Sequence, residues 1–389
     1  MHRDVYLLIL SRALRSMAFG YLVFVIPLYL KALGFPITLI GFYFFIATIS
    51  SALLVLLSGF LGDMIGRRNS LIIMSSLFVV TMAIFSTTID KTLIFITSVL
   101  GTSTGAAGGG GAGGGPIAPL QTSLLADNTE LHERTKVFSL TTSISIISSL
   151  IGSVTSYIIL SLNLGDITLF RLSLALSIVS LAILFLVRND PPRIRSLNIR
   201  NIIPRKSSRS ITKIAIAGSL GSVGLGMVTP LLPLWFRLYL HATEIEINNM
   251  YTASYVVSVI LTLMASRIEN LLGRVKAIAI LRSLSVGMFI VMALIPIFII
   301  DAILYVVRVA MYMVTIPLRQ SLSTEVISDD ERARGLSLTG IARRVPYGVG
   351  SSIAGLLMSY AVYSLPILLG GSIALLDPIL YYVFFRKYR

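Results

Sequence analysis

Long runs of apolar residues, separated by short polar segments, recur along the whole chain. Residues 38–61 carry no charged side chain, and neither do residues 71–88. About 20 apolar residues in a helix, each rising 1.5 Å, cross the hydrocarbon core of a bilayer. The pattern predicts twelve spans, at residues 5–30, 38–61, 71–88, 92–126, 137–161, 167–187, 213–236, 249–268, 275–300, 302–325, 336–361 and 364–385. We therefore expect an all-α membrane protein with twelve transmembrane helices.

The composition supports a polytopic helical membrane protein. Hydrophobic residues make up 55% of the chain and charged residues 13%, with a mean hydropathy of +0.89. The absence of cysteine excludes disulfides and thiolate chemistry. No phosphate-binding G-x-x-x-x-G-K-[ST] loop is present, so ATP hydrolysis is not expected. We expect neither a metal ion nor a cofactor. The first apolar run lacks a small-residue cleavage pattern and is expected to remain as the first helix.

The basic residues are distributed unevenly between the two sides of the predicted spans. With the N-terminus in the cytoplasm, the inside segments hold 21 of the 32 Lys and Arg. This asymmetry follows the positive-inside rule and predicts cytoplasmic N- and C-termini in a cell membrane. The net charge of +15 thus reflects topology and anionic lipids rather than nucleic acid.

The chain contains a repeat of about half its length. A polar, basic, Pro-containing segment at 188–212 is the predicted cytoplasmic linker between six-helix bundles at 1–187 and 213–389. Equivalent residues in the two halves pair as follows: Gly20 with Gly226, Pro119 with Pro317, Asp127 with Glu325, and Gly152 with Gly350. Repeated halves are typical of transporters that move one bundle against the other.

The segment GFLGDMIGRR at residues 59–68 joins the second and third predicted spans. It resembles the G-x-L-x-D-x-x-G-R-R signature of the major facilitator superfamily, and more specifically the branch of drug/proton antiporters. The resemblance implies two pseudo-symmetric six-helix bundles, secondary transport by alternating access, and no enzymatic activity. It also implies a cytoplasmic gate made of charged residues and one glycine at helix ends: Asp63, Gly66, Arg67, Arg68, Asp127, Glu269, Arg274 and Glu325.

Away from the ends of the predicted spans lie eight charged residues: Arg12, Arg15, Arg282, Arg308, Arg319, Arg343, Arg344 and Asp377. Charged side chains inside a membrane are costly unless they face water or a partner. In the superfamily, spans 1, 4, 7 and 10 line the central cavity, so the resemblance makes Arg15 and Arg308 candidates to bind substrate. Alternatively, they bind backbone carbonyls or hold helices together. Aromatic candidates for the same site are Tyr21, Tyr29 and Trp235, which are otherwise packing residues or interface anchors.

Asp377 is the only carboxylate placed deep within a predicted span. It is a candidate for proton coupling, and the alternative is an ion pair with Arg282, Arg343 or Arg344. All three histidines lie outside the spans, so a histidine relay is not expected.

Two sequence features that are typical of the drug exporters are absent from this chain. Their arginine in span 4 and their Gly-Pro pair in span 5 are missing, with a Gly-rich stretch at 105–115 and only Gly152 in these regions. The first functional expectation is proton-coupled efflux of amphipathic compounds. The alternatives are transport of a carboxylate- or phosphate-bearing anion through the cavity arginines, and lipid transport. The expected partners are a small solute, membrane lipids and protons, and the protein is expected to be a monomer.

Overall fold

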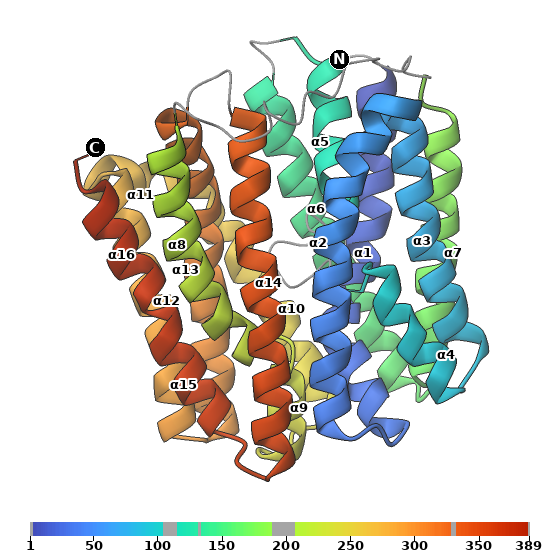
Figure 1. The fold of residues 1–389 in the computed structure, drawn as a ribbon. Helices are drawn as coiled ribbons and strands as arrows, with labels where there is room; N and C mark the ends of the chain where they lie inside the picture. Colours follow the sequence, from blue (N-terminus) through green and yellow to red (C-terminus); the bar gives the residue numbers. More distant parts are fainter. Residues whose placement is uncertain (1–2, 104–114, 131–133, 189–206, 328–331, 388–389) are drawn as a thin grey trace. The chain divides into compact units, whose positions relative to one another are not determined.

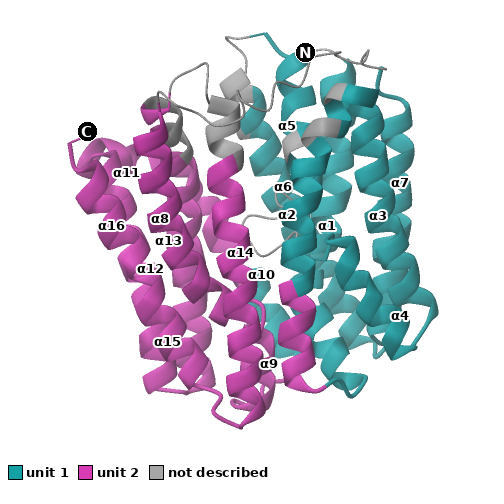
Figure 2. Ribbon diagram, viewed as in Figure 1, with its two compact units in different colours: residues 1–35, 46–196, 244–252 teal, residues 36–45, 197–243, 253–389 magenta. Residues whose placement is uncertain are grey.

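The computed structural model describes residues 3–103, 115–130, 134–188, 207–327 and 332–387. Within them, side chains are not described at residues 59, 60, 63, 119, 134–136, 139, 320, 321, 323–325 and 332–337. The described residues form helices joined by short turns and divide into two units (Figure 1 and Figure 2). Unit 1 contains residues 1–35, 46–196 and 244–252, and unit 2 contains residues 36–45, 197–243 and 253–389.

The helices follow the predicted spans closely. The first half of the chain forms α1 (Arg3–Ala32), α2 (Ile37–Ile65), α3 (Arg67–Thr87), α4 (Lys91–Ile96), the 3-10 helix η1 (Thr97–Leu100), α5 (Ile117–Asp127), α6 (Arg134–Ser161) and α7 (Asp166–Phe185). The second half forms α8 (Ser208–Val228), α9 (Leu232–Leu238), α10 (Glu244–Leu263), α11 (Ala265–Leu272), α12 (Arg274–Leu294), α13 (Phe298–Val326), α14 (Arg332–Ser359), α15 (Leu365–Ala374) and α16 (Leu376–Phe385).

Nine helices in the described residues are long and apolar enough to cross a membrane, or ten if α10 and α11 form one bent span. The fourth predicted span (92–126) holds α4, η1 and α5, and the eleventh (336–361) holds α14. The prediction of an all-α membrane protein with this layout is confirmed. The predicted linker lies largely outside the described residues, as does the Gly-rich stretch apart from Gly115.

Several predicted spans are interrupted helices rather than continuous ones. The seventh span breaks between α8 and α9, beside Pro230 and Pro233, and the twelfth breaks at Leu375, three residues before Pro378. Proline has no backbone N–H and its ring clashes with the preceding turn, so a break at these places is expected. The eighth span bends by 54° between α10 and α11. Hydropathy alone does not reveal the breaks in the seventh and twelfth spans, because the segments on both sides of each break are apolar.

Two equivalent helix crossings reflect the sequence repeat. In unit 1, α1 and α6 meet at Gly20 and Gly152, where an added Cβ would collide with the backbone of Ser149 or Met17. In unit 2, α8 and α14 meet at Gly226 and Gly350, where an added Cβ would collide with the backbone of Tyr347 or Val223. Small residues permit this close approach of helices in membranes. The four glycines paired in the sequence therefore perform the same packing role in both units.

A second equivalent pair of glycines begins a helix in each half. Gly66 precedes α3 with φ +89° and ψ 147°, and Gly273 precedes α12 with φ +77° and ψ 148°. Residues with a Cβ rarely adopt this backbone conformation. Their carbonyls accept the first backbone hydrogen bonds of the two helices, from Ser70 at 3.1 Å and from Ala277 at 2.9 Å.

Replacing Gly273 by alanine is expected to lower the free energy of unfolding by about 1–3 kcal/mol, because alanine is strained at this φ. No atom lies within 4 Å of an added Cβ there, so a steric clash does not contribute. Gly287, within α12, also has no atom within 4 Å of an added Cβ and provides the matched control. Gly287→Ala should leave stability unchanged or raise it by about 1 kcal/mol. Thermal unfolding in detergent measures both variants, and equal effects would contradict the role of the backbone conformation.

Candidate functional site

Two arginines of α1 form the centre of a polar cluster in unit 1. Arg12 and Arg15 stand about one turn apart and share a face of the helix. Arg15 is 3% exposed, and its Nη2 donates to Oε1 of Gln121 on α5 at 2.7 Å. Gln121 in turn donates to the carbonyl of Leu8 at 2.8 Å, which fixes the orientation of its amide. Arg12 Nε donates to Oγ of Ser145 on α6 at 2.9 Å.

The positive charge of this cluster is not balanced within the described part of unit 1. Neither Arg12 nor Arg15 forms an ion pair with a described carboxylate. Nη1 of Arg15 is buried and has no hydrogen-bond partner there. Burying a charged donor without an acceptor is unfavourable, so this arrangement favours binding of an anion. Arg15 was predicted from the sequence, whereas Gln121 was not.

In unit 2, four helices meet at a buried carboxylate. Asp377 of α16 accepts hydrogen bonds from Arg282 of α12 and from both terminal nitrogens of Arg319 of α13, the latter at 3.0 and 3.1 Å. Gly221 of α8 packs directly on Asp377, since an added Cβ would collide with the Asp377 side chain. The guanidinium groups of Arg282 and Arg319 also lie 4.6 and 4.8 Å from aromatic ring centroids, those of Tyr312 and Tyr381.

The ion pair between Asp377 and Arg282 is one of the alternatives that the sequence suggested, but Arg319 was not predicted as a partner of Asp377. Arg308, Tyr312, Thr315 and Arg319 recur at helical spacing along one face of α13. That stripe of polar and aromatic residues is the signal that would have placed Arg319 on the same face as Arg308. Arg343 of α14 packs against Gly218 of α8, one turn before Gly221, since a Cβ added at Gly218 would lie 3.0 Å from the Arg343 side chain. Nε of Arg343 has no hydrogen-bond partner among the described residues.

Arg308, the second candidate for substrate binding, is surrounded by aromatic rings. It is 6% exposed, and its guanidinium lies 3.9 Å from the ring centroid of Phe289 on α12. The rings of Tyr305 and Tyr312 are both 5.9 Å away. Aromatic faces attract a cation through their quadrupole, so they provide part of the stabilisation that water would give.

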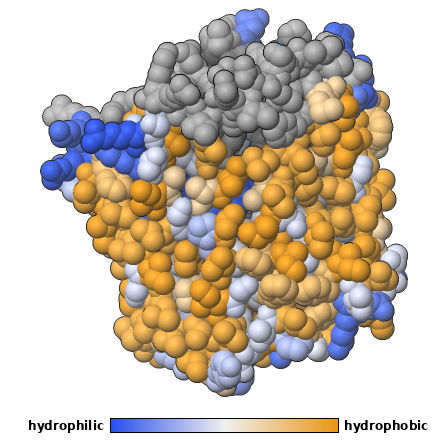
Figure 3. Space-filling model, viewed as in Figure 1, coloured by the Kyte–Doolittle hydropathy of each residue, from blue (hydrophilic) through white to orange (hydrophobic). Residues whose placement is uncertain are grey.

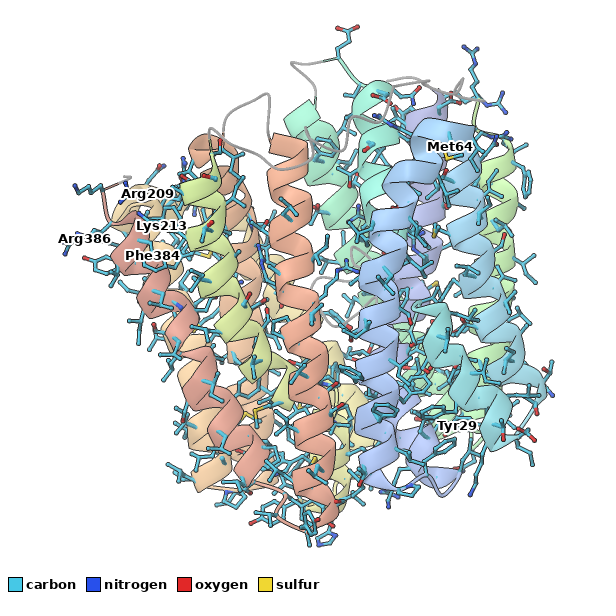
Figure 4. All side chains as sticks on the ribbon, viewed as in Figure 1. Tyr29, Met64, Arg209, Lys213, Phe384 and Arg386 are labelled. Atoms are coloured by element: carbon cyan, nitrogen blue, oxygen red, sulfur yellow. The ribbon has the colours of Figure 1, made fainter. Side chains whose placement is uncertain are left out.

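The three aromatic candidates are buried in the interior of their own units. Tyr21 shares a 2.7 Å hydrogen bond with Ser173 of α7, and its hydroxyl donates to the carbonyl of Leu169 at 3.2 Å. Tyr29, near the end of α1 (Figure 4), lies 4.9 Å from Phe170 and 6.2 Å from Phe85 between ring centroids. Trp235 lies 5.2 Å from Phe236 and 5.8 Å from Tyr239. These contacts favour packing over substrate binding.

Several predicted gate residues hold helix ends together. Arg67, at the start of α3, forms an ion pair with Asp127, the last residue of α5. Arg68 donates to the carbonyls of Leu184 and Phe185 at the end of α7, at 3.4 and 2.6 Å. In unit 2, Arg274 pairs with Glu269 at 2.6 Å. The side chains of Asp63 and Glu325 lie outside the described residues.

Asp301 is a buried carboxylate that the sequence analysis placed outside the spans. Helix α13 begins at Phe298, four residues before the predicted span, so Asp301 lies in its first turns. Its side chain has no exposed surface, and neither carboxylate oxygen has a hydrogen-bond partner in the described structure. Phe298 and Tyr305, one turn on either side, contact the ring of Phe236 on α9. Asp377 is therefore not the only carboxylate buried within a helix.

Replacing Asp377 by asparagine is expected to lower the free energy of unfolding by about 3–5 kcal/mol, because two buried guanidinium groups lose their counter-ion. Glu269→Gln is the matched control, since this carboxylate belongs to an ion pair whose side chains are 21% and 28% exposed. Glu269→Gln should lower the free energy of unfolding by less than about 1 kcal/mol. Thermal unfolding in the same detergent measures the stability of both variants. A loss of stability in Asp377→Asn no larger than that in Glu269→Gln would show that the cluster does not stabilise the fold.

The comparisons with known proteins agree with this architecture. The sequence model of the Major Facilitator Superfamily matches residues 8–212 and 214–389. The POT family transporter PepTSo has a similar structure, with a TM-score of 0.81 and 13% identity over 100% of this chain and 98% of that chain. A D-xylose-proton symporter gives a TM-score of 0.75 and 17% identity over 98% of both chains. The human organic anion transporter MFSD10 gives a TM-score of 0.70 and 14% identity over 98% of this chain and 100% of that chain. The comparison with curated proteins finds no significant match.

Proposed function

The chain belongs to the Major Facilitator Superfamily, and from this premise we propose that it is a secondary transporter of small organic anions. The main support is the environment of Arg15, a buried guanidinium with a neutral acceptor, a further donor without a partner, and no carboxylate paired with it among the described residues. A guanidinium binds carboxylate and phosphate oxygens in a fork-shaped geometry, often through two hydrogen bonds. The proposed ligand therefore carries one of these groups.

Three helices of unit 1 contribute polar groups to the cluster that contains Arg15. Arg12 comes from α1, Gln121 from α5 and Ser145 from α6. The hydrogen bond from Nη2 of Arg15 to Oε1 of Gln121 leaves Nη1 for the ligand and holds the guanidinium plane in place. Pre-organised donors of this kind raise affinity because fewer side chains must be ordered on binding. The proposed anion binds at Nη1 of Arg15, with Arg12 adding long-range attraction.

Efflux of amphipathic compounds and lipid transport remain predictions from the sequence. The similar solved structures include a D-xylose-proton symporter and an organic anion transporter. At 17% and 14% identity they share the fold with this chain, so they do not select a substrate. The unbalanced charge at Arg15 is the feature that favours an anion, and it gives no reason for a neutral amphipathic substrate.

Replacing Arg15 by glutamine is expected to reduce transport of anions at least about tenfold, because one charge-assisted interaction is worth roughly 1.5–3 kcal/mol. The assay is uptake of lactate, succinate or glycerol 3-phosphate into proteoliposomes containing purified protein, with glucose as a neutral solute. Arg15→Lys keeps the charge and loses the planar fork, so its rate of anion transport should lie between those of the unchanged protein and Arg15→Gln.

Arg171→Gln is the matched control, because Arg171 is an exposed arginine on α7 of the same unit. It should transport as the unchanged protein does. Equal transport of anions by Arg15→Gln and the control would rule out the proposed anion site. Loss of transport in both variants would point to a general effect of charge.

We also propose that Asp301, rather than Asp377, carries the proton if transport is coupled to protons. Asp377 is engaged by two arginines, whereas a buried carboxylate without a partner is stable mainly in its protonated form. The basic residues on α13 and on neighbouring helices either lie elsewhere along the helix or donate to another group. Arg274, Lys276 and Arg282 lie in the first half of α12, Arg237 donates to the Ala242 carbonyl, and Arg308 lies two turns further along α13.

Replacing Asp301 by asparagine should abolish accumulation of the anion driven by a pH gradient, because the amide cannot bind and release a proton at these pH values. Exchange of labelled for unlabelled anion across the same proteoliposomes, with no pH gradient, should continue. Asp90→Asn is the control, since Asp90 is an exposed cap of α4 and asparagine caps helices equally well. Gradient-driven accumulation by Asp301→Asn at the level of the control would refute this assignment.

The remaining features of the proposal follow the family and the charge pattern. The transporter is a monomer in a cell membrane, its termini are cytoplasmic, and it works by alternating access. Ion pairs such as that of Arg67 with Asp127 join helix ends and are only partly buried, at 22% and 31% exposure. Partly exposed pairs are weak enough to open and close during a transport cycle. They support the role of these residues in a gate.

A further inference from the structure

Basic side chains surround an apolar cluster at one end of unit 2. Helices α8, α11, α12, α13 and α16 contribute to the cluster, which includes Ile211, Ile214, Val275, Ile278, Leu322, Tyr381 and Phe385, with Ile268 packed against it. Six basic residues adjoin these positions in the sequence and are called the basic rim: Arg209, Lys213, Arg267, Lys276, Arg386 and Lys387. Figure 4 shows Arg209, Lys213 and Arg386 gathered near Phe384 at this end.

The charge of the basic rim is not balanced by nearby acidic groups in the described residues. Five of its members are exposed, and the sixth, Lys213, lies with Nζ 5.8 Å from the ring centroid of Phe384. None of the six forms an ion pair with a described carboxylate. On the same helix ends, Glu269 is paired with Arg274. Six cations at the ends of four helices (α8, α11, α12 and α16) create a local positive potential that attracts an anionic partner.

The surface next to the basic rim is apolar. Leu263, at the end of α10, and Leu271, one turn after Arg267 on α11, are 74% and 84% exposed, and Val383 near the end of α16 is 56% exposed. Figure 3 shows hydrophilic residues at the upper left directly beside the hydrophobic surface of this unit. Exposed leucines beside exposed cations suit the boundary between the acyl chains and the headgroups of a bilayer. A soluble anion would use the cations but not the leucines.

We propose that the basic rim binds the headgroup of an anionic phospholipid, with its acyl chains along α11 and α16. The site differs from a general excess of positive charge, because other arginines at helix ends are already engaged. In unit 1, Arg67 is paired with Asp127, and Arg68 donates to two carbonyls at the end of α7. Five of the six residues of the basic rim instead present their charges at the surface, next to exposed apolar side chains.

The test measures lipid binding to purified protein in detergent by native mass spectrometry. The protein is titrated with phosphatidylglycerol or phosphatidylcholine of identical acyl chains. We expect a preference for phosphatidylglycerol of at least about tenfold, which decreases as the salt concentration rises. The triple variant Arg209→Gln, Arg386→Gln, Lys387→Gln should lose this preference. Each single substitution should reduce it by a smaller step, which provides a second test if the triple variant does not fold.

The control triple variant is Arg3→Gln, Lys91→Gln, Arg171→Gln, in which three exposed basic residues of unit 1 are removed. It has the same net charge as the first variant and should keep the preference. The proposal is overturned if the unchanged protein shows no preference, or if both triple variants lose it equally. It is also overturned if inorganic phosphate, at an ionic strength matched with NaCl, fully displaces the lipid, since the ligand would then be the free anion.

Discussion

A guanidinium inside a helix bundle keeps its charge, so each buried arginine requires acceptors, aromatic rings or a counter-ion. This requirement explains much of the interior. Arg308 lies over the ring of Phe289, and Arg282 and Arg319 share Asp377. Arg15 differs, because its acceptor is the neutral amide of Gln121 and no described carboxylate pairs with it. The contrast separates an arginine group that holds helices together from one that is suited to a ligand.

The cluster at Asp377 also explains why small residues occur at particular positions of α8. Gly221 lies against Asp377, and Gly218 lies against Arg343. A side chain at either position would separate α8 from the charged groups and leave them partly unsatisfied. The glycines and the charges therefore depend on each other, since close packing excludes water and the ion pairs compensate for that exclusion.

The sequence predicted the parts of this structure that depend on local pattern. The spans followed from apolar runs, and the equivalence of Gly152 and Gly350 followed from the repeat. The partners of charged residues were harder to predict. Arg319 and Asp377 are distant in sequence, and their meeting depends on the rotation of two helices. Membrane helices are apolar on most faces, so hydropathy says little about rotation. Asp301 was missed for a simpler reason, because its helix begins four residues before the predicted span.

The unbalanced charge at Arg15 bears on the electrical behaviour of a transport cycle. If a monovalent anion neutralises this charge and no proton is carried with it, the loaded and empty carriers differ by one elementary charge. Moving one charge through a membrane potential of 100 mV changes the free energy by about 2.3 kcal/mol. An inside-negative potential would then act on the return of the empty carrier rather than on the loaded step. The buried arginine would make the voltage, as well as the solute gradient, a determinant of the direction of net flux.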